Sequence, residues 1–114
     1  MNPEPRDAIA AAAEACREKD AARFASLFVL DGELVLAGGQ KIKGQEAIYQ
    51  ATADYFATCE EIRIEIKALH WDGDRAVIEW LWDSGDRITR KVKQRENTIV
   101  LQFQGNAIAS WQES

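Results

Sequence analysis

The residues Glu61-Ile62-Arg63-Ile64-Glu65-Ile66-Lys67 decide the fold, because the pattern of the chain changes there. Three isoleucines alternate with charged residues, which is typical of a half-buried antiparallel strand. Before this stretch apolar residues recur at helical spacing. After it, alternating stretches are separated by turn residues. The chain therefore divides into a helical first half and a second half made of strands.

Three helices are expected in the first half, and they cover residues 7–18, 20–31 and 45–58. Asp20 is a suitable N-cap for the second helix, whose apolar face contains Phe24, Leu27 and Phe28 and which ends at Asp31-Gly32. A short strand over 33–37 and a brief return over 41–43, with a turn between them, predict a small hairpin before the third helix.

The second half predicts a four-stranded antiparallel meander. Asp72-Gly73 and Ser84-Gly85-Asp86 are hairpin signals, and two further strands are expected over 87–103 and 107–113. We expect a single α+β domain over residues 1–114, with three N-terminal helices packed in the concave face of a strongly curved, mostly antiparallel sheet. Pockets tend to form in the space that such a cone leaves.

Composition excludes several classes of function. The chain has 114 residues and a net charge of −5, which argues against a nucleic-acid partner. No apolar run approaches the ~20 residues that span a bilayer, so no membrane partner is expected. Met1–Asp7 lacks the features of a signal peptide, so a cytoplasmic location is expected. Cys16 and Cys59 are expected to be small buried residues, and with His70 as the single histidine we expect no metal and no cofactor.

Trp80 and Trp82 are the most informative residues for function. In a strand they point to the same face, so their indoles lie side by side in an apolar wall. Such a wall forms either the floor of a core or one side of a pocket for an apolar ligand. Buried indole N–H groups prefer partners, which favours a polar or wet cavity over a dry core.

One local stretch is strongly basic in this acidic chain. It contains Arg87, Arg90, Lys91, Lys93 and Arg95. One interpretation is an exposed strand whose cations discourage edge pairing. The alternative is a strip that binds anions.

Several segments carry a resemblance to a known family. They are residues 19–28 (Lys-Asp-Ala-Ala-Arg-Phe-Ala-Ser-Leu-Phe), 42–48, 76–82, 99–103 and 105–113, the last reading Gly-Asn-Ala-Ile-Ala-Ser-Trp-Gln-Glu. In this order and spacing the chain resembles the SnoaL-like branch of the nuclear transport factor 2-like superfamily. The resemblance covers nearly the whole chain and implies the cone-shaped fold. It does not specify a function, because this fold carries isomerases, hydrolases, cyclases and binding subunits.

The catalytic positions of known enzymes in that superfamily can be compared, residue by residue, with this chain. At the three proton-handling positions of ketosteroid isomerase relatives this chain has Ala12, Ala37 and Ile99, none of which transfers a proton. At the positions of limonene-epoxide hydrolase relatives it has Trp80, Trp82 and Glu113, with Leu34 and Leu36 where water is held. Only Glu113 remains as a carboxylate, so neither chemistry is expected by its usual route.

The resemblance implies which face of the sheet holds the site. Trp80, Trp82 and Glu113 then face the helices, as do Ile62, Ile64 and Ile66 of the opening stretch. The residues expected to bind ligand are Trp80, Trp82, Trp111, Ile78, Leu36, Phe28, Tyr55 and Phe103.

Three residues are candidates for catalysis. Glu113 is either a solvated carboxylate near the chain end or, against indoles, an acid or base with a raised pKa. His70 is either exposed or a proton carrier at the pocket rim. Tyr55 is either a core aromatic or a hydroxyl donor to the pocket.

Three functions stay open at this stage. The first is binding of a small, largely apolar molecule, and the second is a lyase, isomerase or hydrolase that uses a pocket carboxylate. The third is a non-catalytic association module with a filled interior. A homodimer through the convex sheet face is expected, with Val77 and Leu81 among its charges.

Overall fold

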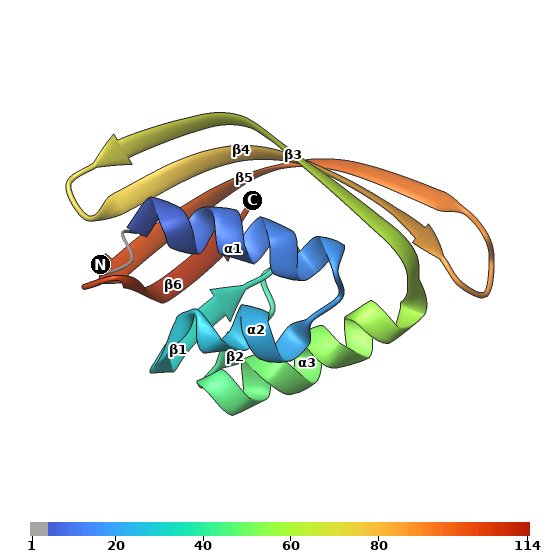
Figure 1. Cartoon of the computed structure of the whole chain (residues 1–114), viewed down its shortest axis with the longest axis horizontal. Coiled ribbons are helices and arrows are strands. Elements are labelled where there is room, and N and C mark those ends of the chain that lie inside the picture. Colours follow the sequence, from blue (N-terminus) through green and yellow to red (C-terminus); the bar gives the residue numbers. More distant parts are fainter. Residues whose placement is uncertain (1–4) are drawn as a thin grey trace.

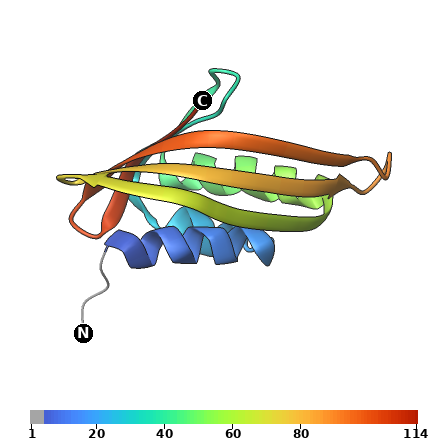
Figure 2. The same cartoon turned by 90° about the horizontal axis from the view of Figure 1, so that it is seen from above.

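The computed structural model describes residues 5–114, so most of the expectation about a signal segment in Met1–Asp7 lies outside the described residues. The elements in chain order are α1 (Pro5–Arg17), α2 (Ala21–Ser26), β1 (Phe28–Val35), β2 (Lys41–Lys43), α3 (Gln45–Thr58), β3 (Cys59–Asp72), β4 (Arg75–Asp86), β5 (Val92–Gln104) and β6 (Ala107–Glu113). Figures 1 and 2 show the long strands β3, β4 and β5 arching over the three helices. The expected α+β fold class is confirmed.

All six strands form one sheet, in the order β2-β1-β6-β5-β4-β3. Strands β3 to β6 make the antiparallel meander that the sequence predicts. Strand β1 pairs parallel to β6, with Leu34 opposite Trp111. This pairing joins the small β1–β2 hairpin to the meander, and it brings the chain end beside the first strand.

The second helix is shorter than the sequence predicts. It ends at Ser26 with Leu27 as its C-cap, and Phe28 already begins β1. Ile108 on β6 draws the chain into the sheet here, because its backbone N–H donates to the carbonyl of Leu27. The expected end of the helix at Asp31-Gly32 is wrong, and those residues lie within β1 where its register with β6 shifts.

Strand β3 changes which of its positions face the helices. Ile62, Ile64 and Ile66 pair with Ser84, Trp82 and Trp80, as expected for the helix-facing side. The register shifts between Ile66 and Ala68, and an extra residue there reverses the alternation. Ile66 itself pairs with Trp80 on the helix-facing side and is 36% exposed, whereas Ile62 and Ile64 are buried.

The turn between β4 and β5 lies beyond the position that the sequence predicts. Ser84 is buried and Gly85 pairs with Val92, so both belong to the β4–β5 ladder. Asp86 begins the turn, and its carboxylate accepts hydrogen bonds from the backbone N–H groups of Ile88 and Thr89. The strand expected over 87–103 therefore begins at Val92.

The core lies between the helices and the concave face of the sheet. Its fully buried side chains include Ile48 of α3, Ile78 of β4 and Ile99 of β5. Cys16 and Cys59 are free and buried, as expected. No helix within residues 5–114 has the length and apolar character needed to cross a membrane.

Candidate functional site

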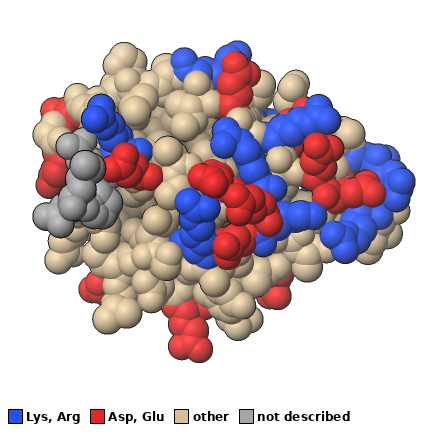
Figure 3. All heavy atoms as spheres, in the orientation of Figure 1, with Lys and Arg blue, Asp and Glu red and all other residues tan. Residues whose placement is uncertain are grey.

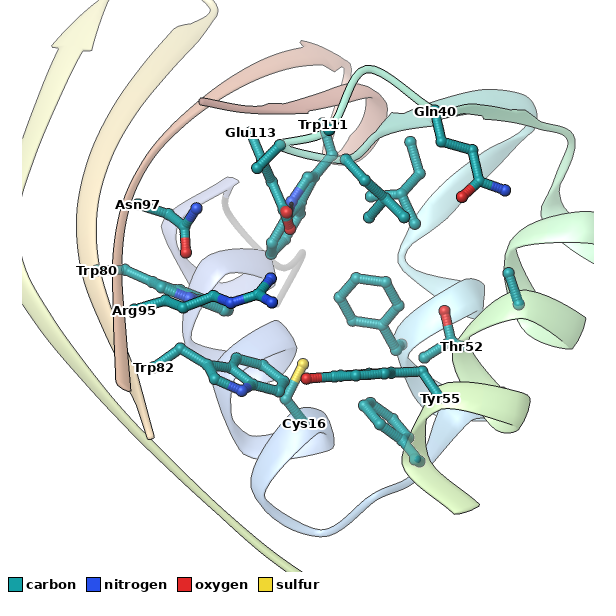
Figure 4. Close-up of a pocket in the computed structure, with 17 residues that line it drawn as sticks. Cys16, Gln40, Thr52, Tyr55, Trp80, Trp82, Arg95, Asn97, Trp111 and Glu113 are labelled. Atoms are coloured by element: carbon teal, nitrogen blue, oxygen red, sulfur yellow. Dashed lines mark hydrogen bonds between the residues drawn. The ribbon is translucent and has the colours of Figure 1, made fainter. Parts of the chain in front are cut away.

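A cavity of about 580 Å³ opens between the sheet and the helices. Its walls are mostly aromatic and aliphatic, with a few polar side chains (Figure 4). The lining residues are Cys16, Phe24, Leu34, Leu36, Ala37, Gly38, Gln40, Ala51, Thr52, Tyr55, Phe56, Trp80, Trp82, Arg95, Asn97, Trp111 and Glu113. A volume of this order suits a small organic molecule.

Three tryptophans form one side of the cavity. The ring planes of Trp80 and Trp82 lie 19° apart with centroids 6.2 Å from each other, so the two indoles make a nearly continuous wall. Trp111 meets Trp80 edge to face, with centroids 5.3 Å apart. Trp80 is 3% exposed whereas Trp82 is only partly buried. The pair therefore serves both as core and as lining, and Trp82 presents more of its surface to the space.

Glu113 lies in the cavity next to Trp111. The Trp111 indole N–H donates a hydrogen bond to its carboxylate, with Nε1 and Oε2 3.1 Å apart. Burial raises the pKa of Glu113, while the Trp111 indole, the Ala37 backbone N–H and the charge of Arg95 lower it to a lesser degree. A buried carboxyl group with a raised pKa in an apolar space is a candidate general acid or base.

Strand β5 contributes two polar residues, Arg95 and Asn97. Arg95 pairs with Trp82 and Asn97 pairs with Trp80, so both side chains stand on the concave face beside the indole wall. Figure 4 shows the guanidinium of Arg95 pointing into the cavity. Arg87, Arg90, Lys91 and Lys93, the other basic residues of this stretch, are exposed as Arg95 is, but they do not line the cavity. They gather at the end of the molecule where β4 turns into β5 (Figure 3).

The helices contribute Cys16 and Tyr55. Tyr55 on α3 lies across from Trp82, with ring centroids 5.9 Å apart, and it is 44% exposed. Burial raises the pKa of the Cys16 thiol to about 12, so this cysteine stays protonated and acts as an apolar lining residue.

The structure brings together most of the residues that the sequence proposes for the site. Trp80, Trp82, Trp111, Leu36 and Tyr55 all line the cavity, and so does Glu113.

Other proposed residues lie elsewhere. Ile78, Phe28 and Phe103 are buried in the surrounding core and do not line the cavity. His70 is exposed on β3, opposite Val77, and stands outside the cavity because the register shift at Lys67 turns it to the convex side.

Sequence reasoning did not propose Asn97 for the site, and it considered Arg95 only as part of a strip that binds anions. The alternation of the strand was the available signal, because Arg95 and Asn97 share it with Phe103, which was expected to bind ligand. The basic composition of the stretch favoured a surface role instead. Within the described residues, no three His, Cys, Asp or Glu side chains gather as a metal site.

A curved sheet packed against helices is the architecture that this chain shares with solved proteins of cystatin and ketosteroid isomerase-like fold. Within that class, the sequence model of the SnoaL-like domain matches residues 9–111, so the chain belongs to the SnoaL-like domain family.

Solved structures resemble the chain over nearly its whole length. A protein from Catenulispora acidiphila with a ketosteroid isomerase-like fold, in complex with trimethylamine, has a TM-score of 0.87 at 24% identity and covers 100% of this chain and 86% of its own. A cystatin-fold protein from Novosphingobium aromaticivorans has a TM-score of 0.88 at 17% identity and covers 99% of both chains. The epoxide hydrolase/cyclase-like enzyme SalBIII of salinomycin formation has a TM-score of 0.83 at 15% identity and covers 96% of this chain and 88% of its own.

These similarities establish the fold and not the activity, because all three identities are low. No curated protein matches the chain.

Proposed function

We propose that the protein binds a small, largely apolar molecule in the aromatic cavity. The observation that carries this proposal is the 580 Å³ space beside Trp80 and Trp82. Protein interiors are packed about as densely as organic crystals, and a void of this size costs dispersion contacts on every wall. An association module with a filled interior has no need of such a void, whereas a binding site requires it.

Tryptophan fluorescence offers a direct test. Three of the four tryptophans line the cavity, and Trp71 lies outside it, so Trp71→Phe leaves only reporters that face the ligand. We expect the neutral probe 2-naphthamide to quench this emission saturably. Native mass spectrometry of gently purified protein should also show a bound mass of a few hundred daltons. Absence of both signals would argue for the association module.

A matched pair of variants locates the binding. Leu36 lines the cavity, and Leu36→Trp places a larger side chain in the space. Leu30 is 81% exposed and lies away from the cavity, so Leu30→Trp adds the same group without filling it. Binding of 2-naphthamide should be lost in the first variant and kept in the second. Equal binding to both would place the probe elsewhere.

An enzyme that uses Glu113 as acid or base is the second candidate. Its support is the raised pKa of Glu113 inside an apolar space, with the Tyr55 ring on another wall. The exposed position of His70 gives that residue no contact with the cavity. Once a bound molecule is identified, Glu113→Gln should abolish its conversion and preserve its binding. A variant that converts it at the wild-type rate would exclude this role.

A homodimer through the convex face of the sheet is proposed as the assembly. Val77, Leu81 and Val100 are partly buried apolar residues on that face. Leu81 lies opposite Glu65 and Glu96 in the sheet, so a monomer should tolerate Leu81→Lys. In a dimer the substitution would place one lysine from each protomer in the interface. Analytical ultracentrifugation should show a wild-type dimer and a monomeric variant. A monomeric wild type, or a variant that stays dimeric, would reject this interface.

A further inference from the structure

The guanidinium of Arg95 faces the cavity without a partner from the protein. It stands beside Trp82 and points into the space (Figure 4). Within residues 5–114 it takes part in no ion pair and no hydrogen bond. A guanidinium carries five N–H donors and keeps its charge at any physiological pH. All of these donors are therefore available to a bound molecule or to water.

Most other arginines within residues 5–114 are engaged, whereas exposed Arg75 also has no partner there but does not line the cavity. Some pair with carboxylates and some donate to backbone carbonyls. The pairs are Arg23 with Glu14, Arg63 with Glu61 and Arg90 with Glu60, and the backbone donors are Arg17 to Ile64 and Arg87 to Cys59. Arg95 is exposed as these arginines are, but its guanidinium has no partner and lines the cavity beside Trp80 and Trp82.

Glu113 does not serve as the partner of Arg95, although both line the same cavity. Its carboxylate is held by the Trp111 indole and the Ala37 backbone N–H. Among the causes that act on the pKa of Glu113, burial is the largest and the charge of Arg95 the smallest. Within residues 5–114 no ion pair or hydrogen bond joins this carboxylate to Arg95, so the guanidinium has no bonded counter-charge in the cavity.

The walls favour a flat molecule. Trp80 and Trp82 present nearly parallel indoles, and ring faces of this kind pack well against planar aromatic groups in an offset arrangement. Across the space stand Tyr55 and Phe56 of α3 with Leu36 after β1, which supply apolar contact but no charge.

We propose that the bound molecule is a planar aromatic acid, an assignment that rests on the proposed function. Its rings lie on the wall formed by Trp80 and Trp82, and its carboxylate is held by Arg95. The two parallel N–H groups of a guanidinium match the two oxygens of a carboxylate, which gives such a pair both strength and direction. Asn97, two residues along β5, adds an amide on the same side of the cavity.

Three matched probes test this assignment by titration calorimetry at neutral pH and low salt. The first is 2-naphthoate, the second is the neutral 2-naphthamide, and the third is decahydro-2-naphthoate, which keeps the charge and loses the aromatic plane. Wild-type protein should bind 2-naphthoate roughly tenfold more tightly than 2-naphthamide, the lower end of the range for a charge-assisted hydrogen bond. It should bind decahydro-2-naphthoate more weakly than 2-naphthoate.

Arg95→Gln should remove the preference for 2-naphthoate, because it should weaken binding of 2-naphthoate far more than binding of 2-naphthamide. Arg95→Lys keeps the charge without the planar fork and should retain part of the preference. Arg63→Gln is the control for net charge, because Arg63 is exposed and lies opposite Asp83 in the β3–β4 ladder, on the convex side. This control should keep the full preference.

The outcomes separate the two proposals. If 2-naphthamide binds as tightly as 2-naphthoate, or if Arg95→Gln keeps the preference, the acid assignment is wrong while the binding function stands. If decahydro-2-naphthoate binds as tightly as 2-naphthoate, the planar aromatic part of the assignment is wrong. If none of the probes binds, both the assignment and the proposed binding function fail.

Discussion

Truncation of Trp80 should destabilise the protein far more than truncation of Trp71, although both are tryptophans of the same sheet. Trp80 is 3% exposed and its ring contacts Trp82 and Trp111. A tryptophan buries roughly 150–250 Å². At about 25 cal/mol per Å² this corresponds to an upper estimate of roughly 4–6 kcal/mol. Because one side of Trp80 faces an existing cavity, we expect Trp80→Ala to cost about 4 kcal/mol.

Trp71 provides the matched comparison. It is 43% exposed and has one recorded ring contact, with Phe103. About half of the Trp71 surface is buried, so Trp71→Ala should lower the free energy of unfolding by about 2 kcal/mol. A domain of this size loses about 4 °C in melting temperature per kcal/mol, so the two variants should melt roughly 15 °C and 8 °C below the wild type.

Urea unfolding followed by far-ultraviolet circular dichroism is the assay, because the substitutions change tryptophan emission itself. The slope of the free energy of unfolding against urea should stay unchanged, which would show that the same surface is exposed on unfolding. A loss for Trp80→Ala no larger than that for Trp71→Ala would refute the reasoning. It would mean that Trp80 is held loosely and belongs to the pocket wall alone.

Three further predictions concern single positions. Trp82→Phe removes an indole N–H that is buried without a partner, so the lost ring area should be largely offset and thermal unfolding should change by less than about 1 kcal/mol. Gly32→Ala should cost about 1–3 kcal/mol in urea unfolding, because a Cβ there would meet Phe28 and a backbone oxygen at 3.1 Å; Gly38→Ala, with nothing within 4 Å, should cost little. The folded protein binds a proton at Glu113 more tightly than the unfolded chain does, since burial raises its pKa above 4.5. The stability of wild type relative to Glu113→Gln should therefore fall as pH rises from below 4.5 through the raised pKa and then level off, and a flat difference across that range would contradict it.

The meander and the inward position of the tryptophans could be predicted because they depend on local patterns. Alternation over β3 and β4 and the turn at Asp72-Gly73 specify neighbouring antiparallel strands. Trp80 and Trp82 follow from the parity of one strand, as do Ile78 and Ile99. Each of these features depends on a pattern that spans only a few residues.

The parallel pairing of β1 with β6 could not be predicted in this way. Phe28 and Ile108 are partners in the sheet, yet they are far apart in the sequence. No local sequence pattern predicts such a contact. The same contact removes Phe28 from the helix in which its spacing places it. The register shift at Lys67 is a second case. One extra residue between Ile66 and Ala68 reverses which positions of β3 face the helices, and no turn residue marks it in the sequence.

For Arg95, the basic composition of its segment suggests a surface role, whereas the alternation of side chains along β5 places it on the concave face. Strand β5 pairs with β4 from Val92 onward, while its pairs with β6 begin at Ile99, so the basic segment does lie on a partly open edge. The interpretation as edge protection suits Lys93 and Lys91, which are exposed. It does not suit Arg95, because alternation along the strand turns this side chain toward Trp82.

The separation of Arg95 from Glu113 links the two proposals. Had these residues formed an ion pair, the cavity would be electrically neutral and lined by satisfied groups, and a neutral apolar ligand would suit it best. Instead Glu113 is satisfied by Trp111 and Ala37, and its burial favours the uncharged form. The guanidinium then keeps its donors free beside a flat aromatic wall. A ligand with a planar ring system supplies contact for the wall, and only one with an acidic group also supplies the missing partner, so the same cavity that argues for binding argues for an aromatic acid.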